Sequence, residues 1–158
     1  MEYNAALEIL EFLEKYDEHF RELRSFINEK QEKAAGDDLV WLLDSLTTEQ
    51  KFVMQGNSLE AKRLLLFEGH GVKNYNAEKL VEESPEELKG RMRLVVNSID
   101  DAVKYIQETN RNVLELTRRK MEAQAEILQD SLIAGSDTYD NSGTIIKKIV
   151  DDGIIGSV

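Results

Sequence analysis

The residues of this sequence best equipped for chemistry are its two histidines and its 31 acidic residues. His19 lies three positions before Glu22, so both side chains could face the same way on a helix and hold a metal ion. A dimetal carboxylate site needs two Glu-x-x-His motifs and further glutamates, and the sequence contains no Glu-x-x-His. We therefore expect no metal site, and we interpret His19 as an ordinary residue of an amphipathic helix.

The second histidine, His70, stands between Gly69 and Gly71 in a predicted turn. This Gly-His-Gly has neither the Walker spacing nor the dinucleotide-binding spacing of phosphate-binding loops. The sequence also lacks Cys and a Gly-x-Ser-x-Gly motif, so neither a thiolate nor a serine nucleophile is indicated. Acidic residues this numerous are typical of solvated helix faces. The sequence thus predicts no catalytic residue, no cofactor and no enzyme.

The charge of the chain narrows the classes of partner. Its 158 residues include 20 Lys and Arg against 31 Asp and Glu, a formal net charge of −11. Phosphate backbones and anionic lipids repel such a chain, so we expect neither nucleic acid nor a membrane surface as partner. The only basic run of three is Arg118-Arg119-Lys120. It is typical of a solvated or acid-pairing helix face, and contact with an acidic partner is the alternative.

The apolar runs of the sequence are short. None is longer than a few residues, so membrane insertion is not expected. The first stretch, MEYNAALEILEFLEKYDEHF, is too charged for a signal peptide. Together these features predict neither a membrane-spanning protein nor one secreted by the general route.

The composition, with one Pro, nine Gly and 32% charged residues, favours long helices with narrow apolar stripes. Steps of three and four residues predict a first helix from residue 3 to about residue 34, with this stripe: Tyr3, Ala6, Leu10, Leu13, Tyr16, Phe20, Leu23 and Ile27. Asp37 is expected to cap a second helix over about 38–67, with a second start at Thr47–Gln50 as an alternative. The apolar positions of this helix are Leu39, Leu42, Leu43, Leu46, Val53, Leu64 and Phe67.

The third predicted helix is the longest. It begins at Ser84-Pro85, a capping residue followed by a proline at the first helical position, and continues to about residue 133. Its apolar residues form a heptad pattern: Leu88, Met92, Val95, Ile99, Ala102, Ile106, Thr109, Val113 and Leu116, then Met121, Ala125, Leu128 and Leu132. At 1.5 Å per residue this helix would be roughly 70 Å long, against roughly 45 Å for each of the first two.

This difference in length predicts the fold and an open surface. We expect an all-α protein: an elongated antiparallel bundle of three long helices over 1–134, followed by a mobile amphipathic tail over 135–158. Because the shorter helices cannot cover the end of the third, its apolar residues there need a second copy, a client protein or the tail. The tail segment is too short to fold alone in water, as helix or strand, and carries two i,i+4 pairs: Ile145 with Ile149 and Ile146 with Val150.

Three stretches of the sequence are similar to one known family. Glu108–Leu114, ETNRNVL, with the leucine-spaced helix after it, resembles the asparagine-containing motif of FlgN-type flagellar export chaperones. Thr138–Gly143, TYDNSG, resembles the Thr-Tyr-x-x-x-Gly tail motif of that family. Gln50-Lys51 and Leu59–Arg63 are similar to its second helix, and Gly56 departs from it.

The resemblance implies a cytoplasmic, non-catalytic chaperone. Such a protein binds the C-terminal helical segments of hook-associated proteins, which form the hook–filament junction, and delivers them to the type III export gate. The resemblance places client binding on the C-terminal part of the chain and makes Tyr139 the expected export-gate contact. Together with the open helix end, it gives these expected client-binding residues: Val113, Leu114, Leu116, Met121, Leu128, Leu132, Ile145, Ile146, Ile149 and Val150. We expect the tail to cover the helix end until a client helix displaces it or packs beside it.

Two other interpretations stay open. The same apolar residues could complete a four-helix core within one chain. Alternatively, the heptad from Leu88 to Leu116 could serve as a zipper between two copies, which would make the protein a homodimeric coiled-coil scaffold or adaptor. For the free chaperone we expect a monomer or a weak dimer.

Overall fold

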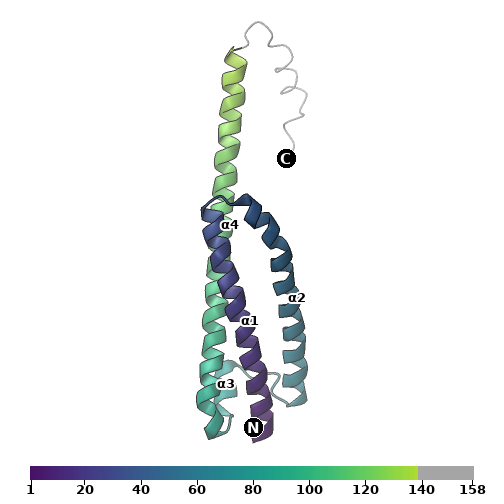
Figure 1. Cartoon of the computed structure of the whole chain (residues 1–158). Coiled ribbons are helices and arrows are strands. Elements are labelled where there is room, and N and C mark those ends of the chain that lie inside the picture. The colour runs from purple at the N-terminus through teal and green to yellow at the C-terminus, as the bar shows by residue number, and fades with distance from the viewer. Residues whose placement is uncertain (139–158) are drawn as a thin grey trace. The chain divides into compact units, whose positions relative to one another are not determined.

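The computed structural model describes residues 1–138, which form helices and turns with no strand among them. The helices are α1 (Tyr3–Ala35), α2 (Leu39–Gly69), α3 (Ala77–Glu82) and α4 (Glu86–Thr138), as Figure 1 shows. The predicted all-α class is confirmed for this part of the chain. α4 has 53 residues, against 33 in α1 and 31 in α2, so the third long helix is the longest, as predicted.

The chain divides into two compact units. Met1–Leu114 form the first unit, and the second begins at Glu115. α4 contributes to both, so its residues up to Leu114 pack in the first unit and its later residues belong to the second. Most of the predicted tail lies beyond residue 138, outside the described residues.

The turn between α1 and α2 depends on two aspartates. Asp37 has a φ of 59°, in the left-handed region that Asp adopts more readily than most residues. Asp38, rather than the predicted Asp37, caps α2, because its carboxylate accepts the Trp41 N–H at 3.1 Å. This bond and the Lys33 ammonium, 3.1 Å away, hold the pKa of Asp38 below its ordinary value. The predicted cap therefore exists, one residue later than expected.

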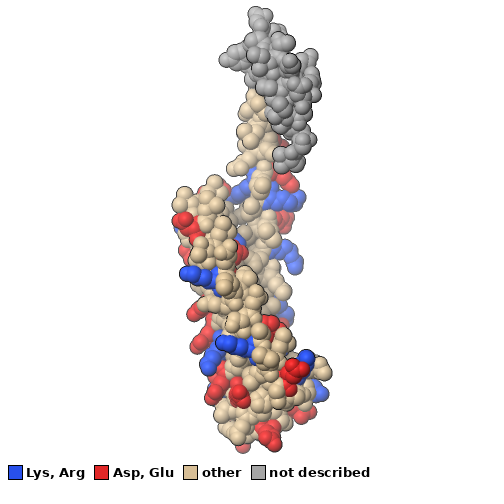
Figure 2. Space-filling model, turned by 90° about the vertical axis from the view of Figure 1, so that its right-hand side faces the viewer, with Lys and Arg blue, Asp and Glu red and all other residues tan. Residues whose placement is uncertain are grey.

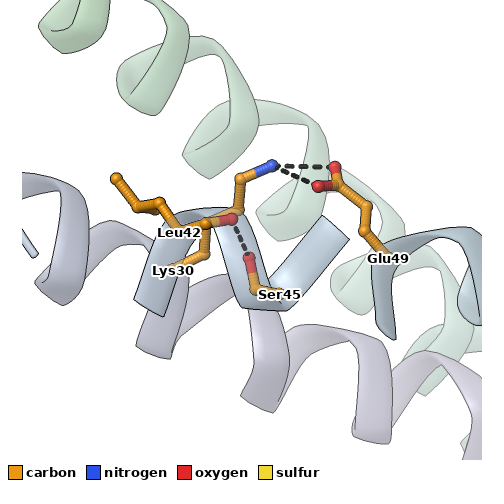
Figure 3. Close-up of polar contacts among 4 residues, drawn as sticks. All are labelled: Lys30, Leu42, Ser45 and Glu49. Atoms are coloured by element: carbon orange, nitrogen blue, oxygen red, sulfur yellow. Dashed lines mark hydrogen bonds and ion pairs between the residues drawn. The ribbon is translucent and has the colours of Figure 1, made fainter. Parts of the chain in front are cut away.

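α1 and α2 run in opposite directions. Three polar pairs join them, and the α2 residue number falls as the α1 number rises: Glu8–His70, Tyr16–Glu60 and Lys30–Glu49. Figure 3 shows the pair nearest the turn, in which the Lys30 ammonium donates to both Glu49 carboxylate oxygens at 2.7 and 2.8 Å. One turn earlier in α2, the Ser45 hydroxyl donates to the Leu42 carbonyl oxygen at 2.8 Å, which satisfies a buried polar group locally.

α1 runs parallel to the part of α4 that lies in the first unit. The Arg91 guanidinium contacts Glu14 at 2.7 Å, and further along both helices the Tyr105 hydroxyl donates to the Asn28 side-chain oxygen. The guanidinium of Arg24 stacks 4.1 Å from the centre of the Tyr105 ring. Both pairings join residues that are 77 positions apart, so the two helices keep one register along their contact.

The core of the first unit confirms most of the predicted stripes of α1 and α4, although Tyr3 is 49% exposed and the buried Ile9 and Phe26 were not among the predicted residues. One buried cluster joins Ile9 and Leu10 of α1 to Met92 of α4, and all three side chains are fully buried. A second cluster, closer to the α1–α2 turn, joins Phe26 and Ile27 to α4. The buried heptad residues of α4 are Leu88, Met92, Val95, Ala102, Ile106, Thr109 and Val113. Because these heptad residues are buried within their own chain, they are not available for the contact between two copies that the alternative interpretation requires.

The predicted apolar stripe of α2 is wrong in its direction. Phe67 is buried and Leu42 is half-buried, whereas the other predicted positions are exposed: Leu39, Leu43, Leu46, Val53 and Leu64. α2 instead packs through Trp41 and Phe52, whose rings lie 6.0 and 5.2 Å from the ring of Phe26. α2 is one helix through Thr47–Gln50, so the alternative second start is not used. The expectation failed because α2 is apolar on two opposite sides.

Candidate functional site

His19 packs as a core side chain. Its ring lies 5.7 and 6.0 Å from the rings of Phe20 and Phe52, and the side chain is buried. A Cβ on Gly56 would come within 3.3 Å of His19 Nε2, so the glycine leaves room for the imidazole between α1 and α2. Burial lowers the pKa of His19, with a smaller opposing effect from Glu22. Among the described residues no three His, Cys, Asp or Glu side chains are grouped to hold a metal ion.

The lowered pKa of His19 predicts a loss of stability in acid. The ordinary value is 6.5, and the folded value lies below it, so protonation favours the unfolded chain. The contribution of neutral His19 is complete above about pH 6.5 and declines as the pH falls through this value. Urea unfolding of wild type and His19→Gln at about pH 7.5 and pH 5.5 measures it. We expect the stability advantage of wild type over His19→Gln to shrink in acid, and an advantage of equal size at both pH values would contradict this prediction.

Two other groups of titratable side chains link α1 to α2. His70 Nε2 lies 2.9 Å from a Glu8 carboxylate oxygen, which ties the end of α2 to the start of α1. The Tyr16 hydroxyl donates to Glu60 at 3.1 Å, while Arg63 donates to both oxygens of Glu60 at 2.8 and 2.7 Å. Arg63 lowers the pKa of Glu60, and burial together with Glu60 raises the pKa of Tyr16. Both shifts hold the groups in their ordinary protonation states, so this cluster lacks an acid–base pair near neutrality.

The basic run in α4 pairs with acids of its own helix. Arg118 Nη1 lies 3.0 Å from Glu122, and Arg119 donates to Glu115 one turn earlier. Both pairs have the i,i+4 spacing that stabilises an exposed helix. The prediction of an acid-pairing face is confirmed for these two arginines.

The expected client-binding residues divide into three groups. Leu114, Met121, Leu128 and Leu132 are exposed to 72%, 65%, 65% and 54%, and Leu116 is half-buried. Val113 is only 6% exposed and packs in the first unit, so its expected place on an open surface is wrong. The tail residues and the expected gate contact lie outside the described residues: Tyr139, Ile145, Ile146, Ile149 and Val150.

The exposed members of this set share one side of α4. At 3.6 residues per turn, Met121, Ala125, Leu128 and Leu132 of the second unit align along the helix, and we call these four residues the α4 apolar face. Three charged side chains of the same segment lie on the opposite side, namely Arg119, Glu126 and Asp130, whereas Arg118 and Glu122 flank the face. An apolar stripe of this kind in a charged helix is typical of a surface that another helix covers.

A second exposed apolar surface lies on α2 and was missed from the sequence. It faces away from α1, and Figure 2, which views the molecule from this side, shows mostly uncharged side chains along the helix. We call it the α2 outer face; its large apolar residues, each at least 44% exposed, are Leu39, Val40, Leu43, Leu46, Val53, Met54, Leu64 and Leu65. The polar members are uncharged as well: Thr47, Gln50, Asn57 and Ser58. The missed signal was that Trp41 and Phe52 lie on the side opposite to the exposed leucines of α2.

None of the described helices is long and apolar enough to cross a membrane. Comparison with protein-family models, with curated proteins and with solved structures finds no match to this chain.

Proposed function

We propose that the chain is a cytoplasmic export chaperone of the FlgN type. In this proposal it binds the C-terminal helical segments of flagellar hook-associated proteins and brings them to the type III export gate. The observation that carries the proposal is the α4 apolar face, three of whose four side chains are large and more than half exposed. The motifs at Glu108–Leu114 and Thr138–Gly143 support it from the sequence.

The spacing of the α4 apolar face suits a helical client. From Met121 onward the face follows steps of four, three and four, which is the pattern that accepts knobs from a second helix. The side chain of Met121 is long and flexible, so it can also adapt to an irregular partner surface. An amphipathic segment laid along this stripe would bury its own apolar side against it.

The acidic character of the chain supports a carrier role. With a formal net charge of −11, chaperone–client complexes repel one another, and this repulsion opposes aggregation of the bound client. The finer architecture belongs to the same proposal: an elongated antiparallel bundle of three long helices that presents the end of α4, with a mobile amphipathic tail that competes with the client. Tyr139 is the proposed gate contact.

Isothermal titration tests this function directly. The full chain is titrated with synthetic peptides that carry the C-terminal helical segments of hook-associated proteins, and with N-terminal peptides of the same proteins as controls. We expect one-to-one binding of a C-terminal peptide and none of the controls. Deletion of residues 136–158 should leave the helices folded while abolishing client or gate binding, and Tyr139→Ala should reduce binding to isolated gate components. Absence of binding to every C-terminal peptide would overturn the proposal.

A further inference from the structure

The α2 outer face is an extended uncharged surface in a chain with 32% charged residues. Between Leu39 and Phe67 the charged residues of α2 avoid it: Asp44, Glu49, Lys51, Glu60, Lys62 and Arg63 all lie at its margins or on the inward side. A helix that is apolar on two sides is normally buried on both. α1 covers the inward side of α2, so the outer face is the side that a binding partner would bury.

The central part of this face, from Leu43 to Leu64, is arranged symmetrically about its centre, and the symmetry ends there because the next step pairs Leu39 with Glu68. Reading backward from Val53 in steps of three, four and three gives Gln50, Leu46 and Leu43. Reading forward from Met54 in the same steps gives Asn57, Ala61 and Leu64. The two series match in type at every step: apolar, amide, apolar, leucine. A helix with this pattern is complementary to a reversed copy of itself.

We propose that the α2 outer face is the contact between two copies of this chain, packed antiparallel about a two-fold axis between Val53 and Met54. A two-fold contact uses the same patch on both copies, which this symmetry of spacing supplies. In the pair, Leu43 of each copy lies against Leu64 of the other, and Leu46 lies against Ala61. The inference does not depend on the proposed function.

The two amides favour a second copy over an apolar client. Gln50 and Asn57 are both exposed in the single chain. An apolar helix laid over them would leave their donors and acceptors without hydrogen bonds, which costs free energy. In the reversed pair Gln50 lies opposite Asn57 of the other copy, so the side-chain amides can bond to each other at two symmetric places. Such buried amide pairs also fix the register of paired helices.

The size of the surface predicts a weak dimer. α2 spans roughly 45 Å, and a helix about 10 Å wide then presents roughly 450 Å² per copy. The total of roughly 900 Å² lies below the 1,200–2,000 Å² of stable interfaces, which indicates micromolar or weaker association. Because each copy carries a formal charge of −11, added salt should strengthen the dimer by screening.

Sedimentation velocity of the full chain from about 1 to 500 µM tests the association. We expect the average mass to rise from 18.1 kDa towards twice this value, and to rise more at high salt. Val53→Glu places carboxylates beside the axis from both copies and should shift dimerisation at least about tenfold in concentration. Leu94→Glu on α4, where the side chain is 73% exposed, is the matched control and should leave it unchanged. A monomer at every concentration, as expected if another protein or the tail covers this face, would overturn the proposal.

Thiol cross-linking tests the direction of packing, because the chain has no Cys of its own. In the antiparallel pair, Leu43 and its counterpart lie roughly 30 Å apart along the axis, beyond a short bismaleimide of about 10 Å. Leu43→Cys alone and Leu64→Cys alone should therefore stay uncross-linked, whereas a mixture of the two variants should give a covalent dimer. Cross-linking of Leu43→Cys to itself would overturn the antiparallel arrangement.

Discussion

Leu128→Asp should weaken binding of a hook-associated C-terminal peptide at least about 100-fold, a loss of about 2.7 kcal/mol. Leu128 is 65% exposed in the middle of the α4 apolar face, so the change should leave the helix intact. When a client helix covers this position, the new carboxylate loses its water without gaining a partner, and an unpaired buried charge is strongly unfavourable. Titration calorimetry with the peptide measures the difference.

Gln129→Asp is the matched control for this variant. It adds the same charge at the next residue, but on the side of α4 that carries Glu122 and Glu126. We expect its affinity to stay within about threefold of wild type, since exposed substitutions usually change free energies by less than ~0.5 kcal/mol. Equal losses in both variants would mean that charge, rather than contact with the α4 apolar face, controls client binding.

Met92→Ala should lower the free energy of unfolding by about 3 kcal/mol, within the range for large-to-small changes in a core. Met92 is fully buried in the cluster that joins α4 to Ile9 and Leu10 of α1. Truncation removes apolar contacts and leaves a cavity that the long helices cannot easily close. Urea unfolding followed by circular dichroism gives the value.

Leu94→Ala provides the comparison on the same helix. Leu94 lies two residues further along α4 and is 73% exposed, so its truncation should change stability by less than about 0.5 kcal/mol. A loss of less than about 0.5 kcal/mol in both variants would show that the contact between α1 and α4 contributes little to the stability of the first unit. A large loss for Met92→Ala alone establishes that this contact holds α4 in place.

The helices themselves were predictable because their signals are local. The heptad of α4 and the three–four spacing of α1 each have one apolar side, so the pattern identifies the buried residues without knowledge of the neighbours. α3 begins in the same local way, after Asn76, whose side chain accepts the Lys79 N–H at 2.8 Å. Class, order and approximate bounds of the elements therefore came from the sequence.

The packing side of α2 could not be obtained in this way. Leu43 and Leu46 on one side and Trp41 and Phe52 on the other give two stripes, and local spacing does not rank them. The choice depends on the aromatic ring of Phe26 in α1, a contact between distant residues. Exposure at the candidate site was predicted better than the packing side of α2. Leu114, Met121, Leu128 and Leu132 are exposed as expected, whereas Val113 is buried in the core.

The parallel pairing of α1 with α4 has a consequence for synthesis of the chain on the ribosome. α1 and α2 can pair as soon as Gly69 has emerged, but the fully buried Ile9 and Leu10 of α1 also pack against Met92 of α4. At 5–20 residues per second, translation from Gly69 to Val113 takes roughly 2–9 s, during which this side of the nascent hairpin stays uncovered. Nascent chains should therefore be most vulnerable to proteolysis and to aggregation in that interval.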